Sequence, residues 1–361
     1  MTTNDRTSRL RIGIDAHAVG EHATGNERFI ANVVREMRAL CDHQLVLFFT
    51  SAAAAAAWPV DQRTQVRLVR PAHPLVRVPF AMPRLVRREK LDALLVQYTA
   101  PRSPGCPVVS VVHDVSFAEH PEWFSASERL WMPRTIPATM RRAAAVVTVS
   151  QFSKSEIERI YGVRNLVVAP DAPDPNLARP TPPAEGKTEP YFLFVGTGPR
   201  KGLMTVLDAM RIRGGGPRLV VVGRHDRLGA DEREAAATLP VSFAGYVDDA
   251  RLAELLQHAV ALLFMSAYEG FGLPVVEAMS VGTPVLASDI PVMREIAGEA
   301  AHLLPLGNAQ ALATAMDQVS GDEALRTNLA ARGLARAADF SWTTSAQIVL
   351  ETLERVARSA R

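Results

Sequence analysis

The feature that most constrains the fold is a repeated alternation of short apolar runs with amphipathic stretches. The apolar runs are rich in β-branched residues and poor in charge, as expected of strands buried on both faces of a parallel sheet. We expect strands at 10–16, 45–50, 66–69, 93–98, 108–114, 145–150, 166–171, 191–196, 218–223, 241–247, 261–266, 284–288 and 301–305. Amphipathic stretches such as 26–40 and 153–162 lie between them, which is typical of doubly wound α/β folds.

A proline-rich segment divides this alternation into two halves. Residues 172–190 contain six prolines and few large apolar residues, which favours a linker. A chain of 361 residues is also long for a single core. We therefore predict one domain over 1–180 and a second over 188–342. A last helix, at about 343–361, could pack on either half, and we assign it to the first.

Composition limits the compartment and the partners. The net charge is +2, and Cys41 and Cys106 are too few for a disulfide framework, so a reducing compartment is expected. The sequence has no apolar N-terminal signal and no run long enough to span a bilayer, which favours a cytoplasmic protein. Arginine is abundant, but nothing beyond that abundance favours nucleic-acid binding.

The segment "AYEGFGLPVVEAMSVG" (267–282) combines two glutamates with a glycine-rich turn. Pro274 suits the first position of a helix, Gly282 suits its C-terminal cap, and Glu277 would fall in the first turn. Glycines allow a ligand to approach the backbone, and free N–H groups at a helix start favour phosphate. With Glu269 in the loop for hydroxyls, the segment suits a sugar nucleotide. The alternative is that Glu277 only complements the helix dipole, which explains neither Glu269 nor the glycines.

Five segments resemble the retaining, GT-B-fold glycosyltransferases of family 4, in particular mannosyltransferases that build cell-surface polysaccharides. The segments are "EGFGLPVVEAMSVGTPVLASD" (269–289), "GTGPRKGLMTVLDAM" (196–210), "FAGYVDDARLAELLQHA" (243–259), "IGIDAHAVGEHATGNERFIANVV" (12–34) and "VVHDVSFAEHPEWFS" (111–125). The resemblance extends over nearly the whole chain. It implies an α/β fold of the GT-B type, with two Rossmann-like doubly wound domains facing across a cleft. The first domain would bind the acceptor and the second the sugar nucleotide.

The resemblance also implies roles for residues of the second half. Glu277 would bind the ribose hydroxyls of the nucleotide, and Glu269 would bind hydroxyls of the donor sugar and act at the reacting centre. Arg200 and Lys201 would neutralise the diphosphate as it leaves. Cations are unfavourable at a helix N-terminus, so an anionic ligand accounts for this pair better than a solvated helix start does. The remaining donor-binding residues implied are Gly196, Gly270, Phe271, Gly272 and Leu273.

In the first half the resemblance assigns His113 to the reacting centre and, with less weight, adds Asp114 beside it. A histidine at a strand end is by itself more often structural. Gly25 and Arg28 belong to a segment that corresponds to the family's glycine-rich first loop, near phosphate and acceptor. The sequence departs from the family at Glu27, where many members have a second glycine. Glu27 adds bulk and negative charge near the expected phosphate site. It either puts in doubt a close approach of the phosphate to the backbone or reflects acceptor binding.

These roles imply a retaining hexosyltransferase that moves a sugar from a nucleoside-diphosphate donor to a glycan or lipid-linked acceptor. GDP-mannose is the first expectation for the donor, ahead of UDP-glucose and dTDP-rhamnose. No cofactor or metal is expected, because the sequence has neither an Asp-x-Asp motif nor a cluster with metal-ligand spacing. The alternative is a non-catalytic protein of the same fold that binds sugar nucleotides, for which the departure at Glu27 leaves room.

The segment 66–90 is basic and apolar at once. Such segments often contact anionic membrane surfaces, and a peripheral contact at the inner face of the membrane would suit an enzyme of lipid-linked glycan synthesis. The alternative is an ordinary surface segment in an arginine-rich chain. The sequence does not fix the acceptor, the linkage or the oligomeric state.

Overall fold

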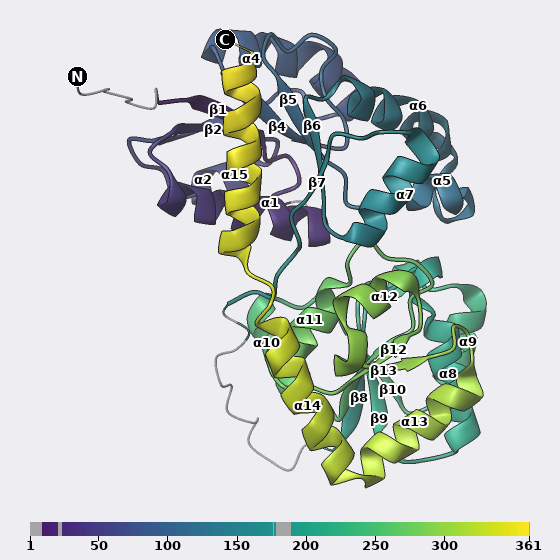
Figure 1. Cartoon of the computed structure of the whole chain (residues 1–361). Helices are drawn as coiled ribbons and strands as arrows, with labels where there is room; N and C mark the ends of the chain where they lie inside the picture. The colour runs from purple at the N-terminus through teal and green to yellow at the C-terminus, as the bar shows by residue number, and fades with distance from the viewer. Residues whose placement is uncertain (1–8, 21–23, 176, 178–188, 361) are drawn as a thin grey trace. The chain divides into compact units, whose positions relative to one another are not determined.

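The computed structural model describes residues 9–20, 24–175, 177 and 189–360. Its described residues form two compact units, each with its own sheet (Figure 1). The first unit comprises the described parts of Met1–Val149, Ser153–Pro170 and Trp342–Arg361, and the second comprises those of Ser150–Phe152 and Asp171–Ser341. The boundaries predicted at 180 and 188 lie outside the described residues.

The first unit contains a parallel sheet of seven strands in the order β3-β2-β1-β4-β5-β6-β7. Its strands are β1 (Arg11–Asp15), β2 (Gln44–Phe49), β3 (Thr64–Leu68), β4 (Ala93–Gln97), β5 (Val108–Val111), β6 (Ala145–Thr148) and β7 (Leu166–Val168). The helical segments are α1 (Thr24–Leu40), α2 (Ala52–Ala57), α3 (Pro74–Val76), η1 (Arg77–Ala81), α4 (Met82–Glu89), α5 (Ser116–Glu119), η2 (Pro121–Trp123), α6 (Ala126–Arg142), α7 (Gln151–Tyr161) and α15 (Trp342–Ser359). Each strand lies within two residues of its predicted start.

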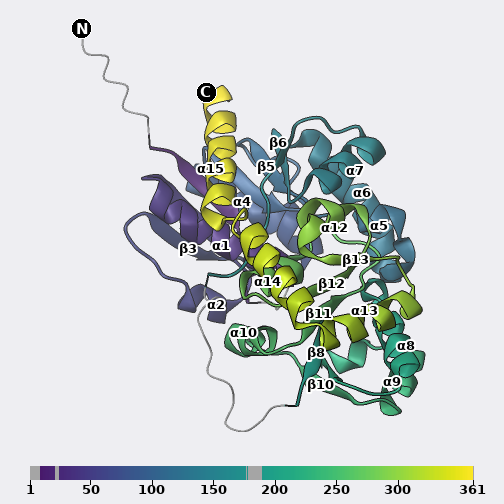
Figure 2. The same cartoon turned by 60° about the horizontal axis from the view of Figure 1, so that its bottom comes forward.

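The C-terminal helix α15 packs within the first unit, beside α1 (Figures 1 and 2). Trp342 at its start meets Phe29 of α1 edge to face, with ring centroids 6.1 Å apart. Further along, Glu354 Oε1 lies 2.9 Å from His43 Nε2, and Thr343 Oγ1 donates to Glu36 Oε2 at 2.6 Å. The last helix therefore completes the core of the unit that begins the chain.

The second unit contains a parallel sheet of six strands in the order β10-β9-β8-β11-β12-β13. Its strands are β8 (Tyr191–Val195), β9 (Arg218–Val222), β10 (Val241–Gly245), β11 (Ala261–Phe264), β12 (Val285–Ser288) and β13 (His302–Leu304). The helical segments are η3 (Pro199–Lys201), α8 (Leu203–Arg213), η4 (His225–Arg227), α9 (Ala230–Ala237), α10 (Asp249–Gln257), α11 (Leu273–Ser280), α12 (Pro291–Ile296), η5 (Gly298–Ala300), α13 (Ala309–Gly321) and α14 (Glu323–Ala337). All these strands were predicted, because each is an apolar run between turn-forming residues.

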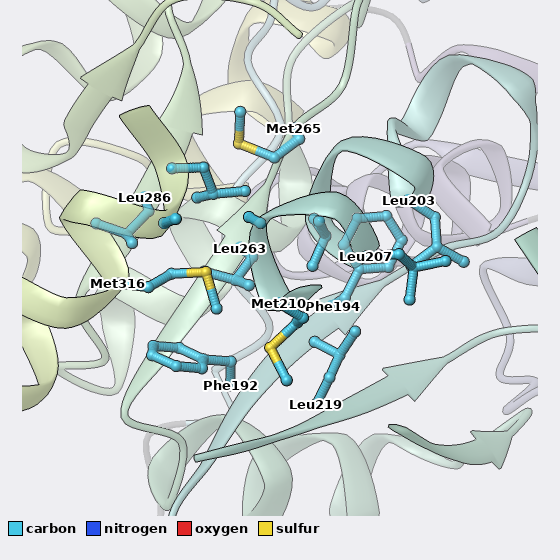
Figure 3. Packing of buried hydrophobic residues seen from close by; sticks show 14 of the residues in the cluster. Phe192, Phe194, Leu203, Leu207, Met210, Leu219, Leu263, Met265, Leu286 and Met316 are labelled. Atoms are coloured by element: carbon cyan, nitrogen blue, oxygen red, sulfur yellow. The ribbon is translucent and has the colours of Figure 1, made fainter. Parts of the chain in front are cut away.

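The core of the second unit holds α8, α9 and α13 against the sheet (Figure 3). Leu203, Val206, Leu207 and Met210 recur at helical spacing on α8 and are buried against the strands. Figure 3 shows Phe192 and Phe194 of β8 beside these side chains. Burying a side chain of this size contributes roughly 1.5–3 kcal/mol. This packing fixes where α8 begins, and so where the loop before it lies.

Candidate functional site

The candidate residues of the second unit lie at the switch point of its sheet. Strands β8 and β11 are hydrogen-bonded neighbours, but the chain proceeds from β8 to one side and from β11 to the other. In sheets of this kind ligands bind beyond the carboxyl ends of such a pair of strands. The loop 196–202 follows β8 and the loop 265–272 follows β11, so both predicted segments reach the same edge.

The two loops are fastened together through their backbones. The amide of Ala267 donates to the carbonyl oxygen of Arg200 at 2.8 Å. Gly202 has a φ of 75°, and a Cβ at this position would lie 2.3 Å from the carbonyl oxygen of Met265. A larger residue would therefore strain its own backbone and displace the second loop. The sequence needs glycine here because the two loops approach so closely.

Three charged side chains form an ion cluster between the loops. Lys201 Nζ donates to Glu269 Oε1 at 2.7 Å, and Arg200 Nη2 lies 3.6 Å from Glu269 Oε2. Glu269 is 7% exposed. Burial by itself would raise the pKa of Glu269, but the charges of Lys201 and Arg200 outweigh it and hold the pKa below its usual value. With Glu269 ionised, the cluster carries one net positive charge.

Glu277 lies one residue deeper in its helix than predicted. Helix α11 begins at Leu273 rather than at Pro274, has no acidic residue in its first turn, and buries Glu277 to 2% exposure. The helix-dipole effect falls off within the first turn, so it does not account for a glutamate at this depth. The expectation that Glu277 lies in the first turn is therefore wrong.

Between Glu269 and Glu277, the groups suited to contact a ligand belong to the backbone rather than to side chains. Phe271 is buried and meets Phe340 edge to face, with ring centroids 5.3 Å apart. Gly272, the N-cap of α11, has a φ of 102° and contributes no capping side chain to the amides that follow. The carbonyl oxygen of Gly270 accepts from Ser150 Oγ at 2.6 Å. The amide of Leu273 at the helix start suits an anion, whereas Pro274 has no N–H and the amide of Val275 donates to the carbonyl oxygen of Gly272 at 2.9 Å.

A similar helix start follows the first loop. Gly202 is the N-cap of α8 and contributes no capping side chain, and the first turn of α8 has no acidic residue. Gly196 has a φ of 98° and donates its amide to the carbonyl oxygen of Val222 at 2.8 Å. Two helix N-termini without capping side chains thus follow the loops that carry the ion cluster.

In the first unit, His113 is buried among aromatic rings close to the end of β5. Its ring lies 5.2 Å from that of Phe29 and 6.0 Å from that of Tyr98, and its Nε2 is 3.3 Å from Gln97 Oε1. The contact places the side-chain amide of Gln97 within hydrogen-bond reach of the ring, and which of the two donates depends on the tautomer of the ring. Burial lowers the pKa of His113 to about 4, which keeps the ring neutral at physiological pH.

Asp114 and Glu27, also singled out in the sequence, accept hydrogen bonds from nearby residues of the first unit. Asp114 Oδ1 accepts from the amide of Ser116 at 2.9 Å and from its hydroxyl at 2.6 Å. Glu27, in the first turn of α1, accepts from the amide of Gly20 at 2.7 Å through Oε1. This bond gives the side chain of Glu27 a structural partner within the first unit. Gly25 lies in the same turn and Arg28 directly follows it, while residues 21–23 of the loop lie outside the described residues.

Two buried polar residues that follow or end strands were not identified as candidates from the sequence. Gln97 ends β4, which neighbours β1 at the switch point of the first sheet, and it contacts His113. Asp171 follows β7 and is buried in the second unit. The sequence signal for each was a polar residue at the end of an apolar run.

Neither a metal cluster nor a membrane span is found where the structure describes the chain. Residues 9–20, 24–175, 177 and 189–360 contain no group of three or more His, Cys, Asp or Glu side chains placed to hold a metal ion. Over the same residues, no helix has the length and apolar content needed to cross a bilayer.

Family models for glycosyltransferases match both halves of the chain. Residues 23–177 match the model described as "Glycosyltransferase Family 4", and residues 179–336 match "Glycosyl transferases group 1". The two matches adjoin and together cover most of the chain.

Curated relatives that resemble the chain are mannosyltransferases. The chain is 30% identical to "O-antigen chain mannosyltransferase B" of Escherichia coli, over 65% of this chain and 66% of that protein. It is 34% identical to "Phosphatidyl-myo-inositol mannosyltransferase" of Mycobacterium leprae, over 49% of each. The chain thus spans somewhat under two thirds of the first relative's length and about half of the second's.

Solved glycosyltransferase structures share the fold over nearly the whole chain. Sucrose-phosphate synthase from Thermosynechococcus elongatus matches with a TM-score of 0.76 at 20% identity, covering 98% of this chain and all of that one. HepE of Anabaena, solved with UDP and glucose, matches with a TM-score of 0.74 at 20% identity, over 96% of this chain and all of that one. The predicted fold class is confirmed: two Rossmann-like doubly wound units of the GT-B type.

Proposed function

We propose that this chain, both halves of which match glycosyltransferase models, transfers a hexose from a nucleoside-diphosphate sugar to a glycan or lipid-linked acceptor. The observation that carries the proposal is the ion cluster of Lys201, Glu269 and Arg200 at the switch point of the second sheet. The cluster combines two cations with an ionised carboxylate and so carries one net positive charge. A nucleoside-diphosphate sugar has the anion and the hydroxyl groups that such a cluster would bind.

Each residue of the cluster has a role in this proposal. Lys201 and Arg200 bind the diphosphate and stabilise the negative charge that builds as the nucleotide leaves. Glu269 fixes both cations and accepts hydrogen bonds from hydroxyls of the donor sugar. Glu277 accepts from the ribose hydroxyls, and the amide of Leu273 at the start of α11 binds a phosphate oxygen. His113, neutral and buried, donates or accepts hydrogen bonds at the reacting sugar.

Mannose is the sugar that the relatives favour, and GDP-mannose is the donor we propose. Both relatives described above are named mannosyltransferases, and the name of the first refers to the O-antigen chain. We further propose that the reaction retains the anomeric configuration and needs no metal ion, as the family resemblance implies. The acceptor would then belong to a polysaccharide or another glycan of the cell envelope.

A turnover assay tests this proposal. The protein is incubated with GDP-mannose, UDP-glucose or dTDP-rhamnose, with and without a membrane extract as the source of acceptor. We expect release of GDP that depends on the extract, and mass spectrometry should find hexose added to the acceptor. Binding of nucleotide without transfer to any acceptor fraction would instead support the non-catalytic binding protein.

We also propose that the exposed residues of the segment 66–90 contact anionic membranes. Two of its arginines have other partners: Arg67 donates to Glu89, and Arg77 is buried against Asp15 at 2.6 Å. Leu68, Val76 and Phe80 are exposed apolar side chains. The exposed basic residues of the segment are Arg70, Arg84, Arg87, Arg88 and Lys90. Exposed cations beside exposed apolar groups suit the headgroup region of a bilayer at the inner face of the membrane.

Co-sedimentation with vesicles tests the membrane contact. Phe80→Glu and Arg88→Gln should each reduce binding to vesicles that contain anionic lipid, because each removes one of the two attractions. Leu130→Glu is the matched control, since Leu130 is an exposed apolar residue elsewhere in the first unit. Absence of binding by the native chain at low salt would contradict the membrane proposal and leave the glycosyltransferase proposal intact.

A further inference from the structure

A short segment of the second unit, Ser150–Phe152, packs against the loop that follows β11. Ser150 is buried, and its Oγ donates to the carbonyl oxygen of Gly270 at 2.6 Å. The ring of Phe152 meets that of Tyr268 edge to face, with the two centroids 5.5 Å apart. The segment therefore contacts the loop directly before and directly after the glutamate of the ion cluster.

This segment is held in turn by Glu295, which lies near the end of α12. The amide of Gln151 donates to Oε1 of Glu295 and the amide of Phe152 to Oε2, both at 2.7 Å. These are the first two amides of α7, a helix with no acidic residue in its first turn. The first amides of a helix have no partner within it, and a carboxylate makes charge-assisted hydrogen bonds with them. Glu295 therefore fixes the segment with both of its oxygens.

The backbone of Glu295 is joined to the far end of the same loop through Arg336 of α14. Arg336 donates through Nη2 to the carbonyl oxygen of Glu295 and through Nε to that of Ile296, both at 2.8 Å. The guanidinium of Arg336 lies 4.8 Å from the ring centroid of Phe340, which meets the ring of Phe271 edge to face. Glu295 is thus connected to the loop from two directions.

Helix α12 also contacts the residue that ends the loop. A Cβ at Gly272 would overlap with Cε of Met293, so α12 leaves no room beside this residue. Every described residue from Tyr268 to Gly272 except Glu269 therefore touches the segment, Phe340 or α12. A carboxylate that only capped α7 would explain the bonds to the two amides, but not why the capped segment packs against this loop.

We propose that Glu295 is a positioning residue of the donor site, whose carboxylate holds the segment Ser150–Phe152 and thereby keeps the loop with Glu269 in its ligand-binding conformation. This inference rests on the proposed function, because that function assigns Glu269 and the amide of Leu273 to the donor. Glu295 acts through the segment and not by contact with the donor. Without its carboxylate the loop samples other conformations, and the affinity falls in proportion to the fraction of molecules in which the loop is in place.

Glu295→Gln tests the inference, because the amide keeps the shape of the side chain, removes its charge and accepts through one oxygen only. Losing a hydrogen bond to a charged group changes an equilibrium between two conformations by roughly 10- to 150-fold. Calorimetry with GDP, or with whichever of UDP and dTDP the native protein binds, should give a dissociation constant about tenfold above the native one. Glu299→Gln is the matched control, since it removes one negative charge at an exposed position nearby and should bind as the native protein does. Native affinity in a folded Glu295→Gln would overturn the inference.

Ser150→Ala is a smaller change that keeps both amides bonded to Glu295 and removes the bond to Gly270. It should also weaken nucleotide binding, by less than Glu295→Gln does. The double variant should weaken binding by less than the product of the two single effects, because both changes act through the same segment. Native affinity in Ser150→Ala, or effects that multiply in the double variant, would overturn the inference.

Hydrogen exchange without nucleotide separates this inference from the proposed function. Mass spectrometry follows the peptides that contain residues 151–152 and 266–273. Both should exchange faster in Glu295→Gln than in the native protein, because local opening becomes easier, and Glu299→Gln should leave both unchanged. Faster exchange at 151–152 alone would show that Glu295 only caps α7, and would overturn the inference. Faster exchange of both peptides in a protein that binds no nucleoside diphosphate would support the positioning of the loop and contradict the proposed function.

Discussion

Replacing Lys201 by methionine tests the ion cluster most specifically. Methionine is similar in length and cannot ionise, so among the described residues Glu269 keeps Arg200, at 3.6 Å, as its remaining cationic partner. In the proposed site Lys201 also binds the diphosphate. A hydrogen bond to a charged group contributes roughly 1.5–3 kcal/mol, and about 1.4 kcal/mol changes an equilibrium constant tenfold. We therefore expect Lys201→Met to weaken binding of the nucleoside diphosphate by about 10- to 150-fold.

The assay is calorimetric titration at fixed ionic strength, with the melting temperature measured beside it. Arg211→Met is the matched control, because it removes one positive charge from the same unit at an exposed ion pair with Asp208. Exposed pairs contribute little, so this variant should bind as the native protein does. If Lys201→Met folds and binds with native affinity, the cluster does not hold the diphosphate. If both variants lose the same affinity, net charge rather than the cluster is responsible.

Two further predictions concern the loops and His113. Gly202→Ala should lower the free energy of unfolding by about 1–3 kcal/mol, because the added Cβ strains the backbone and meets Met265. Gly215→Ala is the control and should not lower it, since a Cβ at that position meets open space. Urea unfolding measures both variants, and equal effects would contradict the close approach of the two loops. His113 has a pKa of about 4 when folded and about 6.5 when exposed, so the unfolded chain binds the extra proton and stability rises with pH between these values. His113→Gln should show a smaller rise in urea unfolding from pH 4.5 to pH 7, and an unchanged rise would contradict burial of the ring.

Much of the fold could be predicted from the sequence because its strands are unusually regular. Runs such as "LVLFF" and "RLVVV" carry few charges and end at turn-forming residues, so period and composition agree. The alanine run 52–57 forms α2, with Ser51 as its N-cap, as the high helix propensity of alanine favours. The pair Arg200 and Lys201 was identified through the resemblance to family 4, and the conflict of two cations with the dipole of the following helix supported an anionic ligand.

The parts that could not be predicted depend on contacts between residues distant in the sequence. Neither the bond from Gly20 to Glu27 nor the burial of Arg77 against Asp15 follows from a local pattern. The burial of Asp171 and of Glu277 likewise depends on packing against segments distant in the sequence. For the same reason, the sequence pattern did not distinguish the exposed arginines of the segment 66–90 from Arg67 and Arg77, which have carboxylate partners.

The central claim is that the second unit binds a nucleoside diphosphate through Glu277 and the ion cluster. The measurement that tests it most directly is calorimetric binding of GDP, UDP and dTDP, without added metal, to the native protein and to Glu277→Gln. The account predicts that one of the three, with GDP expected, binds in the micromolar range, and that Glu277→Gln weakens this binding by about 10- to 150-fold. Native affinity in a folded Glu277→Gln, or binding of none of the three, would contradict it.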